Sequence, residues 1–366
     1  MQAKPQFALA ILFAATAFCQ TPATQTTGQV FHFTYAQEPV SLQEVTNAIR
    51  SAGEITQAFL DTDAKTLTVN GTPAQLAMAS WIFTTMDQPA PANQATQEYR
   101  PAGSVNDVVR TLYLSHPGTR TTFQEIINAV RTIPEITKVF PYVAQNAIVM
   151  RGTDSRIAMA EWLFHQLDLP AGIQPVQDPA AHRYVLSRAD LPVHDNQNVM
   201  QVFFLAHPWT FESMQQIVNT VRTIPELTKV FPCAATGAVA VRAPAATLAL
   251  AAWLFNQLDQ APRISILSPQ EFRMSGGADD VTQVFYLAPA TTTEGLQSIV
   301  TAVRTTVSRA MPEATLKALT IRERPPRSQR PICSSSRWIS PSPTSLPSSL
   351  SGTGNQSRRL PYQCNC

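Results

Sequence analysis

Histidine and aspartate are the residues of this chain that could do metal or acid–base chemistry, and both recur at fixed places. His116 and His207 each precede a proline in the same short motif, where a third copy has Gln37 and a fourth has Pro289. An imidazole at this place could act as a metal ligand or as a base. A metal site needs several converging ligands, and no second ligand lies at a useful spacing. The pattern favours a polar turn residue, and it predicts no metal site and no cofactor.

A carboxylate also recurs, at Asp87, Asp168 and Asp259. A catalytic carboxylate requires a partner group for proton transfer, and no partner recurs with these three residues. The sequence also contains no nucleophile–base constellation, no glycine-rich phosphate loop and no basic–aromatic stripe. These observations predict a protein that is not an enzyme, and they predict neither a nucleic-acid partner nor a small-molecule substrate.

Two further residue types recur and are candidates for a protein interface. A tryptophan recurs late in the copies, where it could pack in the core or anchor a partner protein. An arginine recurs near the end of an expected helix, where it could complement the helix dipole or form an ion pair between copies. From these two series we select five candidate interface residues: Trp81, Trp162, Trp253, Arg131 and Arg222.

These recurrences arise because the chain contains internal repeats. A chain of 366 residues could hold two or three average domains, but repetition on this scale decides the architecture first. We place three modules at residues 29–90, 107–171 and 198–262, and an incomplete fourth at 281–322. The linkers between them are rich in Pro, Gln and Ala, and they predict modules that shift relative to one another. An extra strand is conceivable around Tyr184 to Ser187.

Each module has the same order of secondary-structure signals. Short alternating runs of aromatic and β-branched residues predict strands. Ser41 with Glu44, and Thr122 with Glu125, form capping-box patterns that predict helix starts. A proline such as Pro134 ends the first helix. The order predicts an α+β fold of tandem strand–helix–strand–strand–helix modules, each a three-stranded sheet with two helices on one face.

This order resembles the periplasmic N-domains of secretins, the ring-forming outer-membrane channels of type II secretion and type IV pilus systems. The resemblance covers most of residues 29–322, and no secretin barrel domain follows. It implies envelope or secretion-machinery proteins, or other copies of the chain, as partners. The residues that carry it are the strand Val202–Leu205, the turn Gly152-Thr153, the helix ending Leu167–Pro170 and the similar endings Met86–Pro89 and Leu258-Asp259.

The first residues predict export. Lys4 and the apolar run from Phe7 to Phe18 have the form of a signal peptide within residues 1–19. Cleavage after Ala17 and cleavage at Cys19 both remain open, as does a lipid on Cys19. The net charge of +2 and a charged fraction of 14%, against about 25% in ordinary soluble domains, suit an exported protein. We therefore expect a periplasmic or secreted location, with no transmembrane segment after cleavage.

The last residues, 323–366, differ from the repeats. Their mixture of Pro, Ser and Arg predicts disorder, in place of the second helix of the fourth module. We interpret this tail as a frameshift product. The codons of Trp338 and Ile339 would then read Asp in the other frame, preceded by Leu, Met or Val, which matches the helix ending of the other copies. A genuine disordered tail is the alternative.

Taken together, the sequence predicts a non-enzymatic secreted or periplasmic protein for protein–protein interaction or assembly. The alternative is a truncated fragment of an outer-membrane secretin-type channel that serves protein secretion or pilus export. Of the cysteines, only Cys233 belongs to a repeat, so the modules need no disulfide, and no zinc-site spacing is present.

Overall fold

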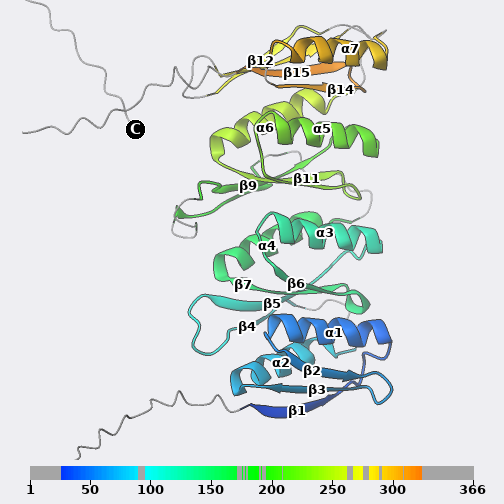
Figure 1. Ribbon diagram of the computed structural model, residues 1–366, viewed down its shortest axis with the longest axis vertical. Coiled ribbons are helices and arrows are strands. Elements are labelled where there is room, and N and C mark those ends of the chain that lie inside the picture. The colour runs from blue at the N-terminus through cyan, green and yellow to red at the C-terminus, as the bar shows by residue number, and fades with distance from the viewer. Residues whose placement is uncertain are drawn as a thin grey trace, which may run out of the picture. The chain divides into compact units, whose positions relative to one another are not determined.

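The chain is described by a computed structural model, whose elements are labelled in Figure 1. The expected signal peptide, the tail from residue 324 onward, and every cysteine except Cys233 lie outside the described residues. Among the residues described, no helix is long and apolar enough to cross a membrane. The structure describes residues 26–89, 95–170, 175, 178, 180–188, 191, 195–207, 209–261, 267–274, 280–287, 291–307 and 309–323.

The predicted α+β fold is confirmed, with the element order strand–helix–strand–strand–helix in the first three repeats. The first repeat has an antiparallel three-stranded sheet in the order β1-β3-β2. Two helices cover one face of this sheet, and they bury its residues Phe31, Leu67 and Val69. The elements of the first repeat are β1 (Thr27–His32), α1 (Pro39–Ala52), β2 (Gln57–Asp61), β3 (Thr66–Gly71) and α2 (Pro73–Met86).

The second and third repeats have the same plan with one additional strand each. Their sheets run β4-β5-β7-β6 and β8-β9-β11-β10, all antiparallel. The second repeat contains β4 (Gln97–Tyr99), β5 (Asp107–Tyr113), α3 (Arg120–Thr132), β6 (Lys138–Tyr142), a 3-10 turn (Val143–Gln145), β7 (Ala147–Thr153) and α4 (Asp154–Leu167). The third contains β8 (Arg183–Val185), β9 (Val199–Phe204), α5 (Phe211–Thr223), β10 (Lys229–Cys233), β11 (Ala238–Ala243) and α6 (Ala245–Leu258).

The fourth repeat is described as far as its last strand, in a sheet of order β12-β13-β15-β14. The prediction of three strands therefore holds for the first repeat, and the linkers supply a fourth strand to the others. Only the one at β8 was expected, because strands of three or four residues leave little pattern in a sequence. The elements of the fourth repeat are β12 (Gln270–Arg273), β13 (Val281–Tyr286), α7 (Thr293–Arg304), β14 (Arg309–Glu313) and β15 (Ala318–Glu323).

The helix starts differ from the two predicted capping boxes. Helix α1 begins at Pro39, so Ser41 lies inside it, and the N-cap of α3 is Thr119, whose hydroxyl accepts a hydrogen bond from the Thr122 N–H at 3.2 Å. The predicted boxes are wrong because the N-cap of each helix lies three residues earlier. Glu44 and Glu125 therefore do not cap their own helices, and both have another role, which is described below.

The cores show that consecutive repeats pack on each other. The apolar cluster around α1 and α2 also contains Tyr142, Ala147 and Val149 from the second sheet. The cluster around α3 and α4 likewise contains Val202 and Ala240 from the third sheet, and the fourth sheet joins the cluster of α5 and α6 in the same way. The expectation that the modules shift freely is wrong, because each of these sheets is buried on both faces.

Candidate protein interface

The recurring aspartates close the loop that follows the first strand of each repeat. Asp87 accepts hydrogen bonds from the N–H groups of Thr34, Tyr35 and Ala36 at 2.7–2.8 Å. Asp168 and Asp259 each accept from two backbone N–H groups at the same place in their own repeats. These residues are therefore placed as anchors between the end of the second helix and the loop.

The recurring histidines sit beside these aspartates. The Nδ1 atom of His116 lies 3.6 Å from Asp168 Oδ1, and that of His207 lies 3.5 Å from Asp259 Oδ1. Each carboxylate also accepts hydrogen bonds from the backbone N–H groups of its loop. Within the described residues no cluster of three or more His, Cys, Asp or Glu side chains could hold a metal ion.

The recurring arginines hold the first helix to the second strand of the same repeat. The guanidinium of Arg131 donates to the Val139 carbonyl at 2.6 Å, and that of Arg222 donates to the Val230 carbonyl at 3.2 Å. Arg50 and Arg304 make the same bond in the first and fourth repeats. These four bonds all lie within one repeat, whereas the sequence suggested an ion pair between copies for this series. A contact of Arg131 or Arg222 with a partner protein stays a prediction.

The recurring tryptophans lie where one repeat meets the next. The ring of Trp81 on α2 is 5.6 Å from that of Tyr99, which belongs to the linker strand of the second sheet. Trp162 pairs with Tyr184 at 5.6 Å, and Trp253 pairs with Phe272 at 5.5 Å. Tilted ring pairs at such distances are stabilising. Each tryptophan thus contacts the next repeat of its own chain, and a contact with another protein stays a prediction.

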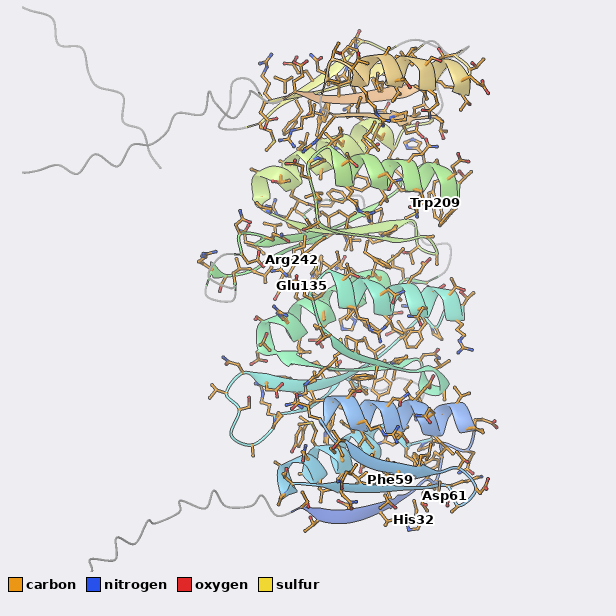
Figure 2. All side chains as sticks on the ribbon, in the orientation of Figure 1. His32, Phe59, Asp61, Glu135, Trp209 and Arg242 are labelled. Atoms are coloured by element: carbon orange, nitrogen blue, oxygen red, sulfur yellow. The ribbon has the colours of Figure 1, made fainter. Side chains whose placement is uncertain are left out.

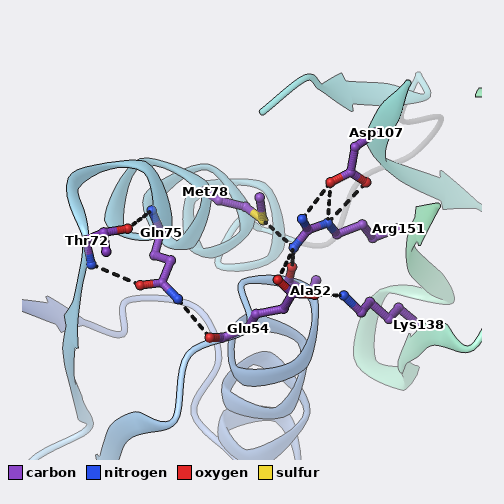
Figure 3. A network of polar contacts seen from close by, with 8 residues as sticks. All are labelled: Ala52, Glu54, Thr72, Gln75, Met78, Asp107, Lys138 and Arg151. Carbon is purple, nitrogen blue, oxygen red and sulfur yellow. Dashed lines mark hydrogen bonds and ion pairs between the residues drawn. The ribbon is translucent and has the colours of Figure 1, made fainter. Parts of the chain in front are cut away.

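A second arginine series, which the sequence analysis missed, joins consecutive repeats. Arg151 on β7 forms an ion pair with Asp107 at 2.5 Å, and it also donates to the Ala52 carbonyl at the end of α1 (Figure 3). Arg322 on β15 pairs with Asp280 at 2.8 Å and donates to the Ile224 carbonyl at 2.7 Å. The last carbonyls of a helix lack partners within it, so these arginines provide hydrogen-bond donors for carbonyls at the end of a helix in the preceding repeat.

The contact between the second and third repeats also uses a strand arginine and an aspartate, with one change. Arg242 on β11 pairs with Asp195 at 2.9 Å and reaches Glu135, at 3.4 Å, in place of a helix carbonyl. Its side chain is only 3% exposed. Asp195 is also 3.8 Å from Lys229. Removal of this buried cation would leave Asp195 without its nearer ion-pair partner.

Wherever two consecutive repeats meet, a glutamate follows the first helix of the preceding repeat and has a left-handed backbone conformation. Glu54, Glu135 and Glu226 have φ angles of 54°, 61° and 62°. Non-glycine residues seldom adopt this region. Each carboxylate pairs with a cation on the next sheet, and the partners are Lys138, Lys229 and Arg309. The hydrogen bond from Lys138 holds the pKa of Glu54 below its usual value.

The first helix also accepts a hydrogen bond from the next repeat. Glu44 accepts from the Val143 N–H at 2.9 Å, and Glu125 accepts from the Ala235 N–H at 3.0 Å. Gln216 accepts from the Ala314 N–H at 2.6 Å in the third joint. Burial raises the pKa of Glu44, although the Val143 N–H and Arg120 oppose this. We call the whole set, namely the strand arginine, the helix-end glutamate and this acceptor, the joint.

The sheet of the first repeat has none of these joint residues. Asn70 pairs with Gln57 across β3 and β2, at the register where Arg151 pairs with Lys138 in the second repeat. The outer face of this sheet is exposed, with Phe59 62% and Val30 52% accessible. Figure 2 labels Phe59, His32 and Asp61 on these outer strands. We call this surface, made of Val30, His32, Phe59, Thr68 and Asn70, the open sheet face.

The open sheet face corresponds to surfaces that are buried elsewhere in the chain. Phe140 and Phe231 occupy the position of Phe59, and both pack on the preceding repeat's helices. Val202 occupies the position of Val30 and is 2% exposed. An apolar surface of the same kind is therefore covered in three repeats and uncovered in one. It is the best candidate interface among the described residues, although neither Trp nor Arg of the predicted set belongs to it.

No protein-family model matches the chain, and no curated relative matches its sequence. Among solved structures, the N-terminal domain of the secretin XcpQ from Pseudomonas aeruginosa matches at 14% identity, over 40% of this chain and 63% of that one, with a TM-score of 0.18. Aeromonas hydrophila ExeD matches at 12% identity, over 82% of this chain and 59% of that one, with a TM-score of 0.15. A protein of unknown function from Aeropyrum pernix, APE0754, matches at 14% identity, over 41% of this chain and 85% of that one, with a TM-score of 0.22.

The matched structures thus include the N-terminal domain of a secretin, the kind of domain that the sequence pattern resembles. The chain spans less than two thirds of the length of the XcpQ domain and of ExeD. With identities and TM-scores this low, the likeness carries no conclusion about activity or partners.

Proposed function

We propose that the chain is a non-enzymatic protein-interaction or assembly protein of the cell envelope, exported by its signal peptide, and that a protein partner binds the open sheet face. The observation that supports this is the contrast between the four sheets. Three have an outer face buried under helices, and the first has the same kind of face exposed.

The exposed side chains on this face are of the type that protein interfaces bury. Val30 on β1 and Phe59 on β2 flank β3, and both lie opposite Thr68 of that strand. Large aromatic and aliphatic groups contribute most of the binding energy at the centre of an interface. Burial of an exposed apolar side chain contributes about 1.5–3 kcal/mol, so a partner that covers this pair gains free energy without needing an ion pair.

The recurring polar residues support a non-enzymatic role for a separate reason. The aspartates bind loop backbone, the first arginine series binds strand carbonyls, and the second series joins the repeats. Each of these groups is already used to hold the fold. A catalytic carboxylate or base instead needs access to a substrate and a partner for proton transfer.

Site-specific photo-crosslinking tests the proposal. A photoreactive amino acid at position 59 should form an adduct with a protein partner when cells that express the full chain are irradiated. Val185 on β8 is the matched control, because it is also 62% exposed but lies on a linker strand. Equal adduct formation from both positions, or none from position 59, contradicts the proposal.

A second candidate is a fragment of an outer-membrane secretin-type channel, which the resemblance of the repeats to secretin N-domains favours. The gene decides between the two. A frame that resumes the fourth module after residue 322 and continues into a barrel domain supports the fragment. An unbroken frame through Cys366, with a peptide from residues 324–366 found in the expressed protein, contradicts both the fragment and the frameshift.

A further inference from the structure

A second uncovered face lies on the first helix of the fourth repeat, α7. Ala302 is exposed on this helix, two residues before the recurring arginine. Ala48 and Ala129 hold the same place before Arg50 and Arg131, and both are completely buried. Ile299, one turn earlier, is 36% exposed. Within the described residues, α7 therefore has a helix face of the kind that the next sheet covers at every joint.

The open sheet face and this helix face are the two kinds of surface that each joint pairs. Within one chain, α1 packs on β6, α3 packs on β10, and α5 packs on β14. The first sheet has no preceding helix in the described residues, and α7 has no following sheet there. Within the described residues, the first sheet therefore has an uncovered outer face, and α7 has an uncovered helix face of the kind that would pack on it.

Both surfaces also lack the charged residues of the joint. Ser298 stands six residues before Arg304, where α1 and α3 have Glu44 and Glu125. The Ser298 hydroxyl donates to the Glu294 carbonyl of its own helix at 2.9 Å. On the sheet side, Asn70 and Gln57 stand where the other sheets have two cations. A charge buried without its partner is costly, so contact between these two faces would bury no unmatched charge.

The turn after β2 is closed by its own acidic residue. At the internal joints, a backbone N–H after the second strand donates to the preceding helix. In the first repeat the N–H groups of Asp63 and Ala64 donate to Asp61 of their own turn, at 3.0 and 2.8 Å. Glu313, at the same register in the fourth repeat, accepts from the N–H groups of its own turn in the same way and is buried, so an acidic turn of this kind is compatible with a covering helix.

We propose that the occupant of the open sheet face is a second copy of this chain, which covers it with the outer face of α7. The contact is head-to-tail and uses the geometry of the internal joints without their ion pairs. A heterologous contact of this kind repeats from copy to copy and produces open chains of copies unless a rotation closes them. This deepens the proposed function and rests on it, because it names the partner that binds the open sheet face.

Two single variants of the full chain test the arrangement. Phe59→Glu blocks the sheet face and leaves α7 intact, and Ala302→Glu blocks α7 and leaves the sheet face intact. Both positions are exposed, so both variants should retain the circular dichroism spectrum and the unfolding midpoint of the wild type. Val185→Glu, also on an exposed strand position, is the control that should associate like the wild type.

Sedimentation velocity over a concentration series gives the readout. We expect the wild type to form species larger than a dimer, and each blocked variant alone to associate about 30-fold or more weakly. An equimolar mixture of the two variants should form a heterodimer and nothing larger, because it retains one intact sheet face and one intact helix face.

Two outcomes overturn the proposal. If Ala302→Glu alone still dimerises while Phe59→Glu does not, two sheet faces pair with each other instead. If the wild type is monomeric at its highest soluble concentration, the second copy is not the occupant. After that second result, the proposed function is still supported if photo-crosslinking from position 59 captures a different envelope protein. If no adduct forms, the proposed function is contradicted as well.

Discussion

The outer sheet faces of the first and third repeats have the same place in the fold and opposite surroundings. In the third repeat, Val202 and Ala240 are buried beneath α3 and α4, and Arg242 holds the edge of the contact. In the first repeat, Val30 and Thr68 are at least partly open, and Asn70 replaces the arginine. The comparison shows that apolar residues alone do not mark which face is covered. The charged residues of the joint do.

The largest effect is expected from the buried cation of the middle joint. Arg242→Met removes the nearer cation of Asp195 and one of the two cations beside Glu135, and it should lower the free energy of unfolding by about 3–5 kcal/mol. Chemical denaturation measures this. Asn70→Met, at the same position on the open sheet face, is the control and should change the free energy of unfolding by less than about 0.5 kcal/mol. Equal losses of stability in Arg242→Met and Asn70→Met would mean that the joint residues do not distinguish the covered sheet face from the open sheet face.

The next effect compares covered and open helix faces. Ile217 on α5 is 5% exposed and lies five residues before Arg222, as Ile299 lies five residues before Arg304. Ile217→Ala should cost about 2–5 kcal/mol because it leaves a cavity. Ile299→Ala, at a position 36% exposed, should cost clearly less. Thermal unfolding of both variants is the measurement, and an unchanged midpoint for Ile217→Ala refutes its place in the core.

A smaller effect is expected from the valines of the two sheet faces. Val202→Ala removes two buried carbon groups and should cost about 2 kcal/mol, from about 0.8 kcal/mol for each group and a small cavity. Val30→Ala removes the same groups from a side chain that is half exposed, and its cost should be well under half of this. If the two costs agree at protein concentrations where the chain is monomeric, the first sheet face is covered by some part of the chain itself.

The sequence predicts the repeat and its elements well because short-range patterns determine them. The apolar spacing of Phe123, Ile126, Ile127 and Val130 is enough to predict α3, and all four are buried. The joint could not be predicted in the same way. Arg151 and Asp107 are 44 positions apart, and Arg151 and Ala52 are 99 apart, so no local pattern relates them.

Two local signals also misled the prediction for physical reasons. Glu44 and Glu125 fit the spacing of a capping box, but their carboxylates accept hydrogen bonds from the next repeat. The Pro- and Gln-rich linkers suggested mobility, yet Tyr99 and Tyr184 within them form tilted ring pairs with tryptophans of the preceding helices. The predicted interface residues show the same limit, since a recurring tryptophan marks a contact without identifying which chain provides the other side.

The smallest effect concerns the pH dependence of the first joint. The pKa of Glu44 is raised by burial, so the folded state disfavours its charged form. The resulting cost is absent below the unfolded pKa, near 4.5, and is complete above the raised folded pKa. Glu44→Gln keeps an acceptor for the Val143 N–H, as Gln216 does for Ala314. Its stability relative to the wild type should therefore rise as the pH increases from 4 to 7.

Glu54→Gln should show the opposite trend and serves as the matched control. The Lys138 hydrogen bond lowers the pKa of Glu54, so the charged form favours folding above the unfolded pKa, and this contribution is lost as the pH falls through the lowered value. The stability of Glu54→Gln relative to the wild type should then fall as the pH rises. Urea denaturation of the three proteins at several pH values measures both slopes. Slopes of the same sign would show that burial of Glu44 under the second repeat does not control its charge.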